Sequence, residues 1–414
     1  MGPLVWSPKE DRIAFKRAAS QYGEPGAIYV ITVKDGVENK LVNLANANLS
    51  AGIDWSPDGT QIAFSDMVPN LHELAVYVLD LKTGEKRKLT SPPVNIWGDW
   101  DPKFSPDGSS LAFKRVSDFW ADDIYVMPAA GGSLTRITSE RHGVWGHAWT
   151  RDSRSLIVSC QRGGTVFGLW RFGVGSNAQP ARFIEGGVNS ITPATSTRTD
   201  RAAWVNMLDD SNIYRIPMSG GGAPQKLIAS NLSDQGATYS RDGRIAYLSD
   251  RSGNREIWLS NADGSGQTQV TSFNGPLIDY VQWSPDNRHL VFDGRTPGGS
   301  SLFALDCKAG MDCEAPKAMN LGVSATYPAW SADARLLYFS SHQSGEWEIW
   351  KMSVAGGPAA QVTRHGGYTS QESPDGQWLS IQNQTGQAFG VPRALNFTAR
   401  APPTKNWSSG LPSN

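Results

Sequence analysis

Eight residues that could bind a ligand lie two to four positions before a site that is aromatic in most copies of a repeated pattern. They are Trp100, Asp101, Trp145, His147, Asp279, Tyr280, Tyr327 and Tyr368. Aromatic rings combined with a few polar groups are typical of ligand pockets and protein-docking faces. The alternative is that these rings only fill space between packed strands.

Seven aspartates occupy the same place in a recurring turn, which raises the question of a calcium site. They are Asp58, Asp107, Asp152, Asp242, Asp286, Asp333 and Asp375. Calcium needs roughly six to eight oxygen ligands converging on one point, whereas these aspartates occur once per repeat. We therefore expect each aspartate to bond the backbone of its own turn.

The six histidines could hold a metal only if several of them came together. They are His72, His142, His147, His289, His342 and His365. Only His147 lies just before an aromatic repeat position, two residues ahead of Trp149, and the others are scattered over predicted loops and strands. The sequence therefore predicts no metal site and no cofactor.

Motifs of common enzyme classes do not occur in this sequence. It has no G-x-S-x-G nucleophile elbow, and His72-Glu73 is followed by Leu74, Ala75 and Val76, which lacks the second histidine of a zinc protease motif. The glycine runs at 220–222 and 355–357 join predicted strands, so they are no phosphate-binding loop. We predict that the chain is not an enzyme.

The elements that would position these residues follow from the turn Trp55-Ser56-Pro57-Asp58-Gly59, whose residue order favours a type I turn. The Ser or Thr that follows the aromatic position recurs at intervals of 42 to 49 residues, as Ser7, Ser56, Ser105, Thr150, Ser196, Ser240, Ser284, Ser331 and Ser373. A four-stranded propeller blade takes about 40 to 45 residues. The chain is thus a repeat protein with one blade per interval.

Each interval contains four strand signals, for example a strand ending on Trp55 and further runs at 61–65, 76–78 and 87–90. We predict an all-β fold with a single β-propeller of eight four-stranded blades over 1–384; seven or nine blades stay open because the sequence does not show how the ring closes. The blade units start near 4, 53, 102, 147, 193, 237, 281 and 328, with a partial ninth near 371, and 385–414 form a poorly patterned C-terminal tail. The aromatic repeat positions should pack between blades.

Composition limits the partners and the compartment. With 38 Lys and Arg against 39 Asp and Glu, the net charge is -1, so nucleic acid is not expected as a partner. No apolar run reaches the length of a membrane span, and no signal peptide pattern precedes the first predicted strand. We expect the protein to be a monomer. Cys307 and Cys313 could close a small disulfide loop or be two free thiols.

The WSPDG hairpin, the Ile-Tyr-Val third strand at 124–126, the Gly-Gly turn at 131–132 and the Leu-Thr strand at 89–90 resemble the TolB-type, WD-like propeller repeats of bacteria. The resemblance covers residues 4 to about 382. The same blade pattern is similar to the propeller halves of dipeptidyl-peptidase-like and tricorn-like proteases. The resemblance to TolB-type repeats implies a periplasmic or other extracytoplasmic location.

Two longer segments, 88–108 and 347–376, resemble parts of the C-terminal propeller of certain bacterial regulators. These regulators carry a winged-helix DNA-binding domain at the N-terminus. That narrower resemblance implies a sensor domain. We therefore expect a non-catalytic binding or scaffold module of a bacterial regulatory or cell-envelope system, with a protein, peptide or small ligand at the channel mouth. The alternatives are the propeller part of a hydrolase and a metal-dependent propeller lyase.

Overall fold

The computed structural model describes the chain in ranges that together cover most of residues 4–392. They are 4–18, 25–45, 52–69, 73–94, 96–118, 121–139, 143–162, 166–175, 179–183, 189–196, 198–208, 210–218, 222–273, 277–296, 299–308, 310–382 and 388–392. The regular elements in these ranges are strands, which confirms the all-β prediction. The chain divides into two compact units, 1–162 with 166–208 and 163–165 with 209–414.

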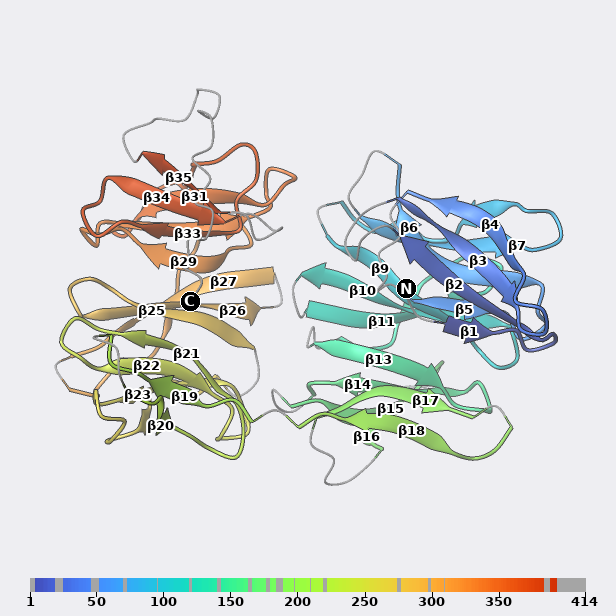
Figure 1. Ribbon diagram of the computed structural model, residues 1–414, viewed down its shortest axis with the longest axis horizontal. Helices are drawn as coiled ribbons and strands as arrows, with labels where there is room; N and C mark the ends of the chain where they lie inside the picture. Colours follow the sequence, from blue (N-terminus) through green and yellow to red (C-terminus); the bar gives the residue numbers. More distant parts are fainter. Residues whose placement is uncertain are drawn as a thin grey trace. The chain divides into compact units, whose positions relative to one another are not determined.

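In unit 1, the strands within each repeat pair antiparallel with their neighbours in sequence (Figure 1). Its strands are β1 (Leu4–Trp6), β2 (Arg12–Ala18), β3 (Gly26–Thr32), β4 (Glu38–Leu44), β5 (Ile53–Trp55), β6 (Gln61–Met67), β7 (Leu74–Asp80), β8 (Lys86–Lys88), β9 (Gly98–Phe104), β10 (Ser110–Asp118), β11 (Ala121–Pro128), β12 (Thr135–Arg136), β13 (Val144–Trp149), β14 (Ser155–Cys160), β15 (Gly168–Gly173), β16 (Ala181–Arg182), β17 (Ser190–Thr195) and β18 (Ala202–Asn206). The sets β5–β8 and β9–β12 join into one eight-stranded sheet through a single parallel pairing of Leu74 with Gly98. The predicted four-strand repeat is therefore present from the first set to the fourth.

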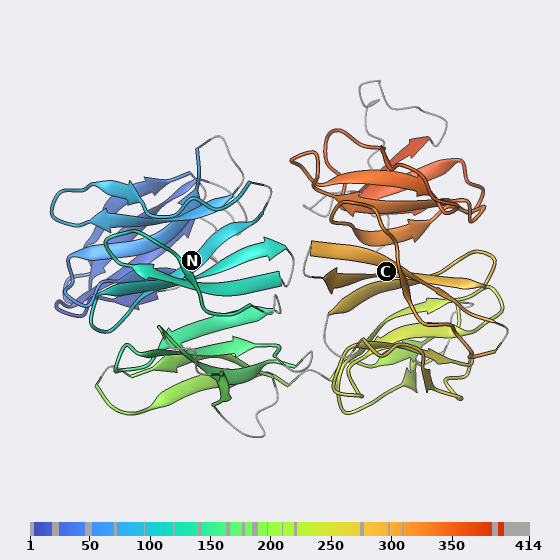
Figure 2. The same cartoon turned by 180° about the vertical axis from the view of Figure 1, so that it is seen from behind.

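Unit 2 repeats the same arrangement (Figure 2). Its strands are β19 (Ile213–Arg215), β20 (Gln225–Ile228), β21 (Asp234–Tyr239), β22 (Ile245–Ser249), β23 (Glu256–Ser260), β24 (Thr268–Gln269), β25 (Ile278–Trp283), β26 (His289–Thr296), β27 (Gly299–Asp306), β28 (Lys317–Ala318), β29 (Thr326–Trp330), β30 (Leu336–Ser341), β31 (Glu348–Ser353), β32 (Ala360–Gln361), β33 (Thr369–Glu372), β34 (Trp378–Gln382) and β35 (Ala388–Pro392). Three four-stranded sheets are followed by the three-stranded sheet β33–β35. Its last strand, β35, lies in the segment predicted to be a poorly patterned tail. The strand forms there through pairing with β34, although its own sequence shows no strand pattern.

The fifth repeat departs from the others. Its strands form two separate two-stranded sheets, β17–β18 in unit 1 and β19–β20 in unit 2. This is the repeat whose turn lacks Pro and Gly, although Ser196 still accepts a backbone hydrogen bond of 2.9 Å from Thr199. A single eight-bladed ring over 1–384 stays a prediction.

The repeated turn has the predicted chemistry. In the second repeat, the Gly59 N–H donates to the Ser56 carbonyl at 2.8 Å, and Gly59 takes a left-handed φ of 76°. The Ser56 hydroxyl donates to the Asp58 carboxylate at 2.6 Å, and the same carboxylate accepts the Thr60 N–H at 3.0 Å. The first and second strands of the blade are thereby joined in one register.

All seven turn aspartates accept a hydrogen bond from the Ser or Thr hydroxyl two residues earlier. In Asp58 and Asp107, the hydroxyl bond holds the pKa of the carboxyl below its usual range. The prediction that these aspartates serve their own turns is confirmed.

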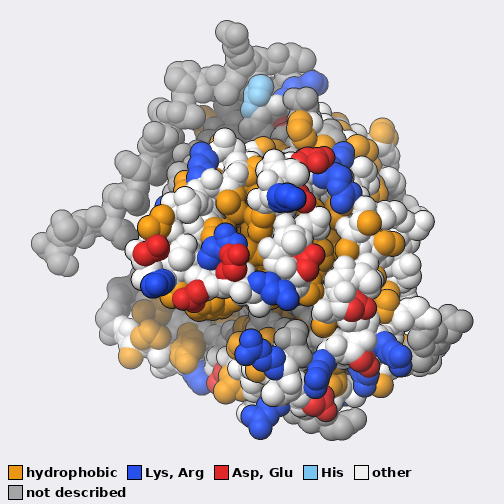
Figure 3. Space-filling view, turned by 90° about the vertical axis from the view of Figure 1, so that its right-hand side faces the viewer, with side chains coloured by type: hydrophobic (Ala, Val, Ile, Leu, Met, Phe, Trp, Pro, Cys, Tyr) orange, Lys and Arg blue, Asp and Glu red, His pale blue; other side chains and the backbone are white. Residues whose placement is uncertain are grey.

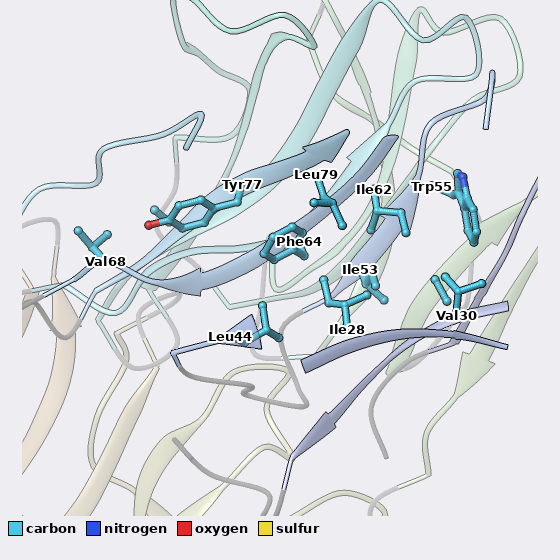
Figure 4. Packing of buried hydrophobic residues seen from close by; sticks show 12 residues of the cluster. Ile28, Val30, Leu44, Ile53, Trp55, Ile62, Phe64, Val68, Tyr77 and Leu79 are labelled. Carbon is cyan, nitrogen blue, oxygen red and sulfur yellow. The ribbon is translucent and has the colours of Figure 1, made fainter. Parts of the chain in front are cut away.

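The hydrophobic core of each unit lies between neighbouring sheets. Trp55 of β5 packs in a cluster with Ile28 and Val30 of β3 and with Ile62 and Phe64 of β6 (Figure 4). Each fully buried side chain of this size stabilises the fold by about 1.5 to 3 kcal/mol. The prediction that the aromatic repeat positions pack between blades is confirmed for this pair.

Charged side chains of both signs are interspersed over the face of the molecule drawn in Figure 3, with hydrophobic side chains between them. The described part of that face thus carries charges of both signs, in agreement with the net charge of -1 of the whole sequence. No helix long and apolar enough to cross a membrane occurs among the described residues.

Candidate functional site

A β-bulge in the first strand of several repeats positions the candidate residues. The residue three places before the aromatic site takes a left-handed backbone at Asp101, Thr192, Gly236, Tyr280 and Tyr327, with φ between 47° and 62°. The pairing register shifts at the same point in each of these strands. A bulge redirects the side chains beside it, and three of the five residues are predicted site residues.

Three tyrosines of unit 2, which we call the tyrosine row, lie in contact. Tyr280 comes from β25, Tyr327 from β29, and Tyr368 directly precedes β33. The ring centroids of Tyr280 and Tyr327 are 4.0 Å apart, and those of Tyr327 and Tyr368 are 4.6 Å apart. The structure thus brings together three predicted site residues from three consecutive sheets.

Exposure differs along the tyrosine row. Tyr280 is 41% exposed, whereas Tyr327 is buried between its neighbours. The hydroxyls of Tyr327 and Tyr368 share a hydrogen bond of 2.8 Å, and burial raises the pKa of Tyr327. Tyr280 is therefore the exposed ring of this pair, and Tyr327 is the buried one.

Beyond Tyr368 the aromatic contacts continue. Trp347 lies 5.4 Å from Tyr368 between ring centroids, and His342 lies 4.9 Å from Trp347. Neither Trp347 nor His342 was predicted as a site residue. The signal was hidden because both lie in the loop between the second and third strands, outside the positions compared between repeats.

Asp279 stands next to Tyr280 on β25, and its carboxylate accepts the Tyr280 N–H at 3.1 Å. Burial raises the pKa of Asp279, and the negative charge of Asp293 adds to the rise. The positive charges of two guanidinium groups, Arg255 and Arg295, lower the pKa of Asp279 by less than this rise. The tyrosine row thus has a partly buried carboxyl group at one end.

In unit 1, Asp101 and His147 form the second group of predicted residues. The Asp101 carboxylate lies 3.9 Å from Nδ1 of His147. His147 is buried, and burial lowers its pKa to about 4. The imidazole is therefore neutral at pH 7.

Three lysines surround Asp101. Although burial raises the pKa of this carboxyl, the charges of its basic neighbours, Lys103 foremost, hold the pKa below its usual range. The other two lysines are Lys114 of β10 and Lys16 of β2, and burial lowers the pKa of Lys16 to about 7. The negative charge of Asp101, and that of Asp54 with it, raises the pKa of the Lys103 ammonium group.

The remaining two candidates of unit 1 contact other rings. Trp100 donates its indole N–H to the Trp97 carbonyl at 3.2 Å, and the Trp145 ring packs against Phe167 at 5.5 Å between centroids. Four of the eight candidates thus lie in unit 1 and four in unit 2. A common channel mouth for all eight stays a prediction.

The structure shows where the described histidines lie. His289 bonds Asp306 at 2.7 Å, and His147 lies beside Asp101. His72 and His142 lie outside the described residues. Among the described ranges, no three His, Cys, Asp or Glu side chains lie close enough to hold a metal ion.

Sequence reasoning missed the charged residues ten places after the aromatic site. Four of the nine repeats have serine there, and in the fourth repeat it links the second strand to the next repeat: the Ser159 hydroxyl donates to the Ser190 carbonyl at 2.7 Å. Lys16 replaces that serine in the first repeat, and its ammonium group donates to the Ser65 carbonyl at 3.0 Å. Lys114 and Asp293 occupy the same position in later repeats. Aligning the repeats beyond the turn would have found all three.

The sheets, their register and the inter-sheet cores define a protein built of β-propeller repeats. Residues 12–216 match the family described as TolB beta propeller domain. Residues 12–216 are therefore similar to TolB-type β-propeller repeats, which is the resemblance that the WSPDG motif predicted. The narrower likeness to winged-helix regulators stays a prediction.

Two curated relatives illustrate the similarity. One is an uncharacterised protein of Agrobacterium fabrum, 24% identical over 197 residues, which are 44% of this chain and 63% of the relative. The other is the Tol-Pal system protein TolB of Francisella tularensis subsp. mediasiatica, 25% identical over 301 residues, which are 67% of this chain and 64% of the relative. The chain thus spans less than two thirds of the length of both relatives.

Solved structures with similarity include TolB from Acinetobacter baumannii, at 18% identity and a TM-score of 0.35, covering 74% of this chain and 66% of that one. Another is the propeller domain of the Trilobed protease from Pyrococcus furiosus, at 11% identity and a TM-score of 0.33, covering 88% of this chain and 95% of that one.

Proposed function

We propose that this chain is a non-catalytic binding module of the bacterial cell envelope, and that Tyr280 with the rest of the tyrosine row contacts a protein or peptide partner. The observation that carries the proposal is the contact of three tyrosines from three sheets, with the outermost ring exposed. Tyrosine suits such a role because a large rigid ring with a hydroxyl gives contact area at little cost in side-chain entropy.

The backbone supports the same interpretation. Tyr280 and Tyr327 have φ values of 51° and 53°, a left-handed conformation that bulky residues rarely adopt. Backbone strain of this kind is concentrated at functional sites. Gly236 occupies the equivalent position in the preceding sheet with φ 62°, so the fold accepts a residue without strain there.

Three facts support the location in the envelope. Residues 12–216 match the TolB propeller family, and a similar protein is named for the Tol-Pal system. In unit 2, Cys307 and Cys313 form a disulfide, which persists in oxidising compartments such as the periplasm. A sensory role within a regulator remains part of this proposal.

A photo-cross-linking amino acid at position 280 tests the proposal in cells of the source organism. We expect a discrete adduct with one protein, whereas the same amino acid at Trp378, an exposed position on β34 of the same unit, gives no such adduct. The affinity of the purified partner is then measured for Tyr280→Ala and Trp378→Ala. A loss of about tenfold or more in the first variant alone supports the site; equal adducts or equal losses at both positions contradict it.

A further inference from the structure

Some aromatic pairs of this protein have a Lys or Arg over their rings, and the described pair Tyr280 and Tyr327 has none. In several repeats a Lys or Arg covers the aromatic pair, such as Lys86 over Tyr77 at 4.6 Å and Arg251 over Trp258 at 4.9 Å. Among the described residues, no Lys or Arg takes such a position over Tyr280 or Tyr327. The negative ring faces that attract cations elsewhere in the chain are thus not covered by a cation here.

Asp279 adds a carboxylate to this surface. Within the described ranges, Asp279 forms no ion pair, because the nearby guanidinium groups bond other acceptors. Arg295 donates to Asp293 at 2.9 Å and to Ser300 at 2.8 Å, and Arg255 donates to both carboxylate oxygens of Asp250 at 3.2 Å. A partly buried carboxylate with no close counter-ion gains free energy when a cation arrives.

The bulge places both features together. In a regular strand, consecutive side chains point to opposite faces, but the register of β25 against β26 shifts between Asp279 and Gln282, at the left-handed Tyr280. The two residues without a register partner are Tyr280 and Val281, and Asp279 is the last paired residue before them. The Asp279 carboxylate accepts the Tyr280 N–H at 3.1 Å, so the carboxylate and the exposed ring belong to adjacent residues at the bulge, and one arriving group can contact both.

We propose that Asp279, Tyr280 and Tyr327 form a subsite for a cationic side chain, a lysine or arginine of the partner polypeptide. The proposal rests on the binding function proposed above and names the chemistry of its partner. A carboxylate beside aromatic rings attracts an ammonium or guanidinium group through both charge pairing and the ring quadrupole.

Two small probes isolate the charge. N-acetyl-lysine methylamide carries the ammonium group, and N-acetyl-norleucine methylamide has nearly the same shape without it. Both are titrated against protein labelled with 3-fluorotyrosine, and the Tyr280 resonance is identified by its loss in Tyr280→Phe. We expect the lysine derivative to bind at least about tenfold more tightly, which corresponds to about 1.4 kcal/mol.

Asp279→Asn should reduce binding of the lysine derivative to the level of the norleucine derivative. Asp263→Asn is the matched control, because it removes the same charge from an exposed turn of the same unit. Equal affinity for both probes, no saturable shift with the lysine derivative, or equal losses in both variants would overturn the proposal. A cross-link from position 280 to a partner would still stand in that case, so failure of the cationic subsite is distinguishable from failure of the binding function.

Discussion

Tyr280 has a backbone conformation that costs a residue with a Cβ roughly 1 to 2 kcal/mol. Glycine avoids that cost, and Gly236 shows that the same position of the repeat accepts it. The presence of tyrosine at this position is therefore attributed to its side chain, which is exposed and in contact with Tyr327. At this residue, stability is lower than the fold allows.

The strain at Tyr280 predicts an unusual order of stability. Tyr280→Gly and Tyr280→Ala both lose the ring, but only Ala keeps a Cβ in the left-handed region. We expect the glycine variant to have a free energy of unfolding about 1 kcal/mol higher than the alanine variant, measured by urea titration.

Gln282, two residues further along β25, provides the control, since its φ is not among the positive ones. There the usual order should hold, with Gln282→Ala about 0.5 to 1 kcal/mol more stable than Gln282→Gly. Finding alanine favoured at both positions would show that Tyr280 is not left-handed.

His147 predicts a pH dependence of stability. Burial lowers its folded pKa to about 4 from the ordinary histidine value of 6.5, so between these values the unfolded chain binds more protons than the folded one. The free energy of unfolding should fall as the pH drops through this window, by up to about 3 kcal/mol, since each unit of pKa shift corresponds to about 1.4 kcal/mol.

In His147→Gln, the decrease between pH 6.5 and pH 4 should be smaller than in the unchanged protein. Urea titrations at several pH values give both slopes. His365→Gln is the control because His365 is exposed, and it should keep the original slope. If His147→Gln and the unchanged protein have parallel slopes, His147 is not buried as a neutral group.

At the scale of the element, Gly52, the residue before β5, lets β9 pack closely against it because it has no side chain. A Cβ added at Gly52 would lie 1.9 Å from Oδ1 and 2.9 Å from Cα of Asp101. The left-handed turn at Asp101 brings that carboxylate toward Gly52. The first strands of two neighbouring repeats thus approach each other closely at this point.

Gly52→Ala should therefore lower the free energy of unfolding by about 1 to 3 kcal/mol. In an Asp101→Gly background the cost should be smaller, because the overlap with the carboxylate is gone and only the contact with the Cα of residue 101, at 2.9 Å, remains. Gly146→Ala is the matched control: it has the same place in the repeat, and its nearest contact is 3.5 Å. Equal costs in both backgrounds would contradict the contact between Gly52 and Asp101.

Most strands and turns could be predicted because their signals are local. The order Ser, Pro, Asp, Gly determines the turn, and aromatic residues of alternating strands determine the core. The left-handed Tyr280 could not be predicted, since tyrosine disfavours that conformation and only the register of β25 against β26 imposes it. For the same reason β35 was missed: its strand depends on pairing with β34.

The candidate site was predicted only in part. The positions before the aromatic site located Tyr280, Tyr327 and Tyr368, which the structure brings into contact. Sequence spacing gave no sign that Trp347 would extend the row, because loops between the second and third strands differ in length from one repeat to the next.

At the scale of the whole molecule, the three cysteines predict the thiol content. The disulfide joins Cys307 and Cys313, and Arg244 holds the intervening loop by donating to the carbonyls of Lys308 at 3.1 Å and Gly310 at 2.8 Å. Cys160 is free and buried, and burial raises its pKa to about 12.

Protein purified from its own compartment should therefore show one reactive thiol in denaturant without reductant and three after reduction. In the folded state Cys160 should react slowly, since little thiolate forms. Replacing both Cys307 and Cys313 by Ser should lower the free energy of unfolding by about 2 kcal/mol, the entropy of closing so short a loop. Three thiols before reduction would contradict the disulfide and weaken the case for an oxidising compartment.

The bulge shared by the repeats has a consequence for how such a protein can diversify. Asp101, Thr192, Tyr280 and Tyr327 all occupy the same left-handed position, so the repeat accommodates acidic, hydroxyl and aromatic side chains there. The conformational cost is nearly the same for each of them, because it arises from the Cβ and not from the rest of the side chain. Thr192 and Tyr280 are exposed, whereas Asp101 is half-buried and Tyr327 is buried. Substitutions at the two exposed positions should therefore change the surface while the sheets and their packing remain as they are, and a library randomised at these two codons would vary the surface without varying the fold.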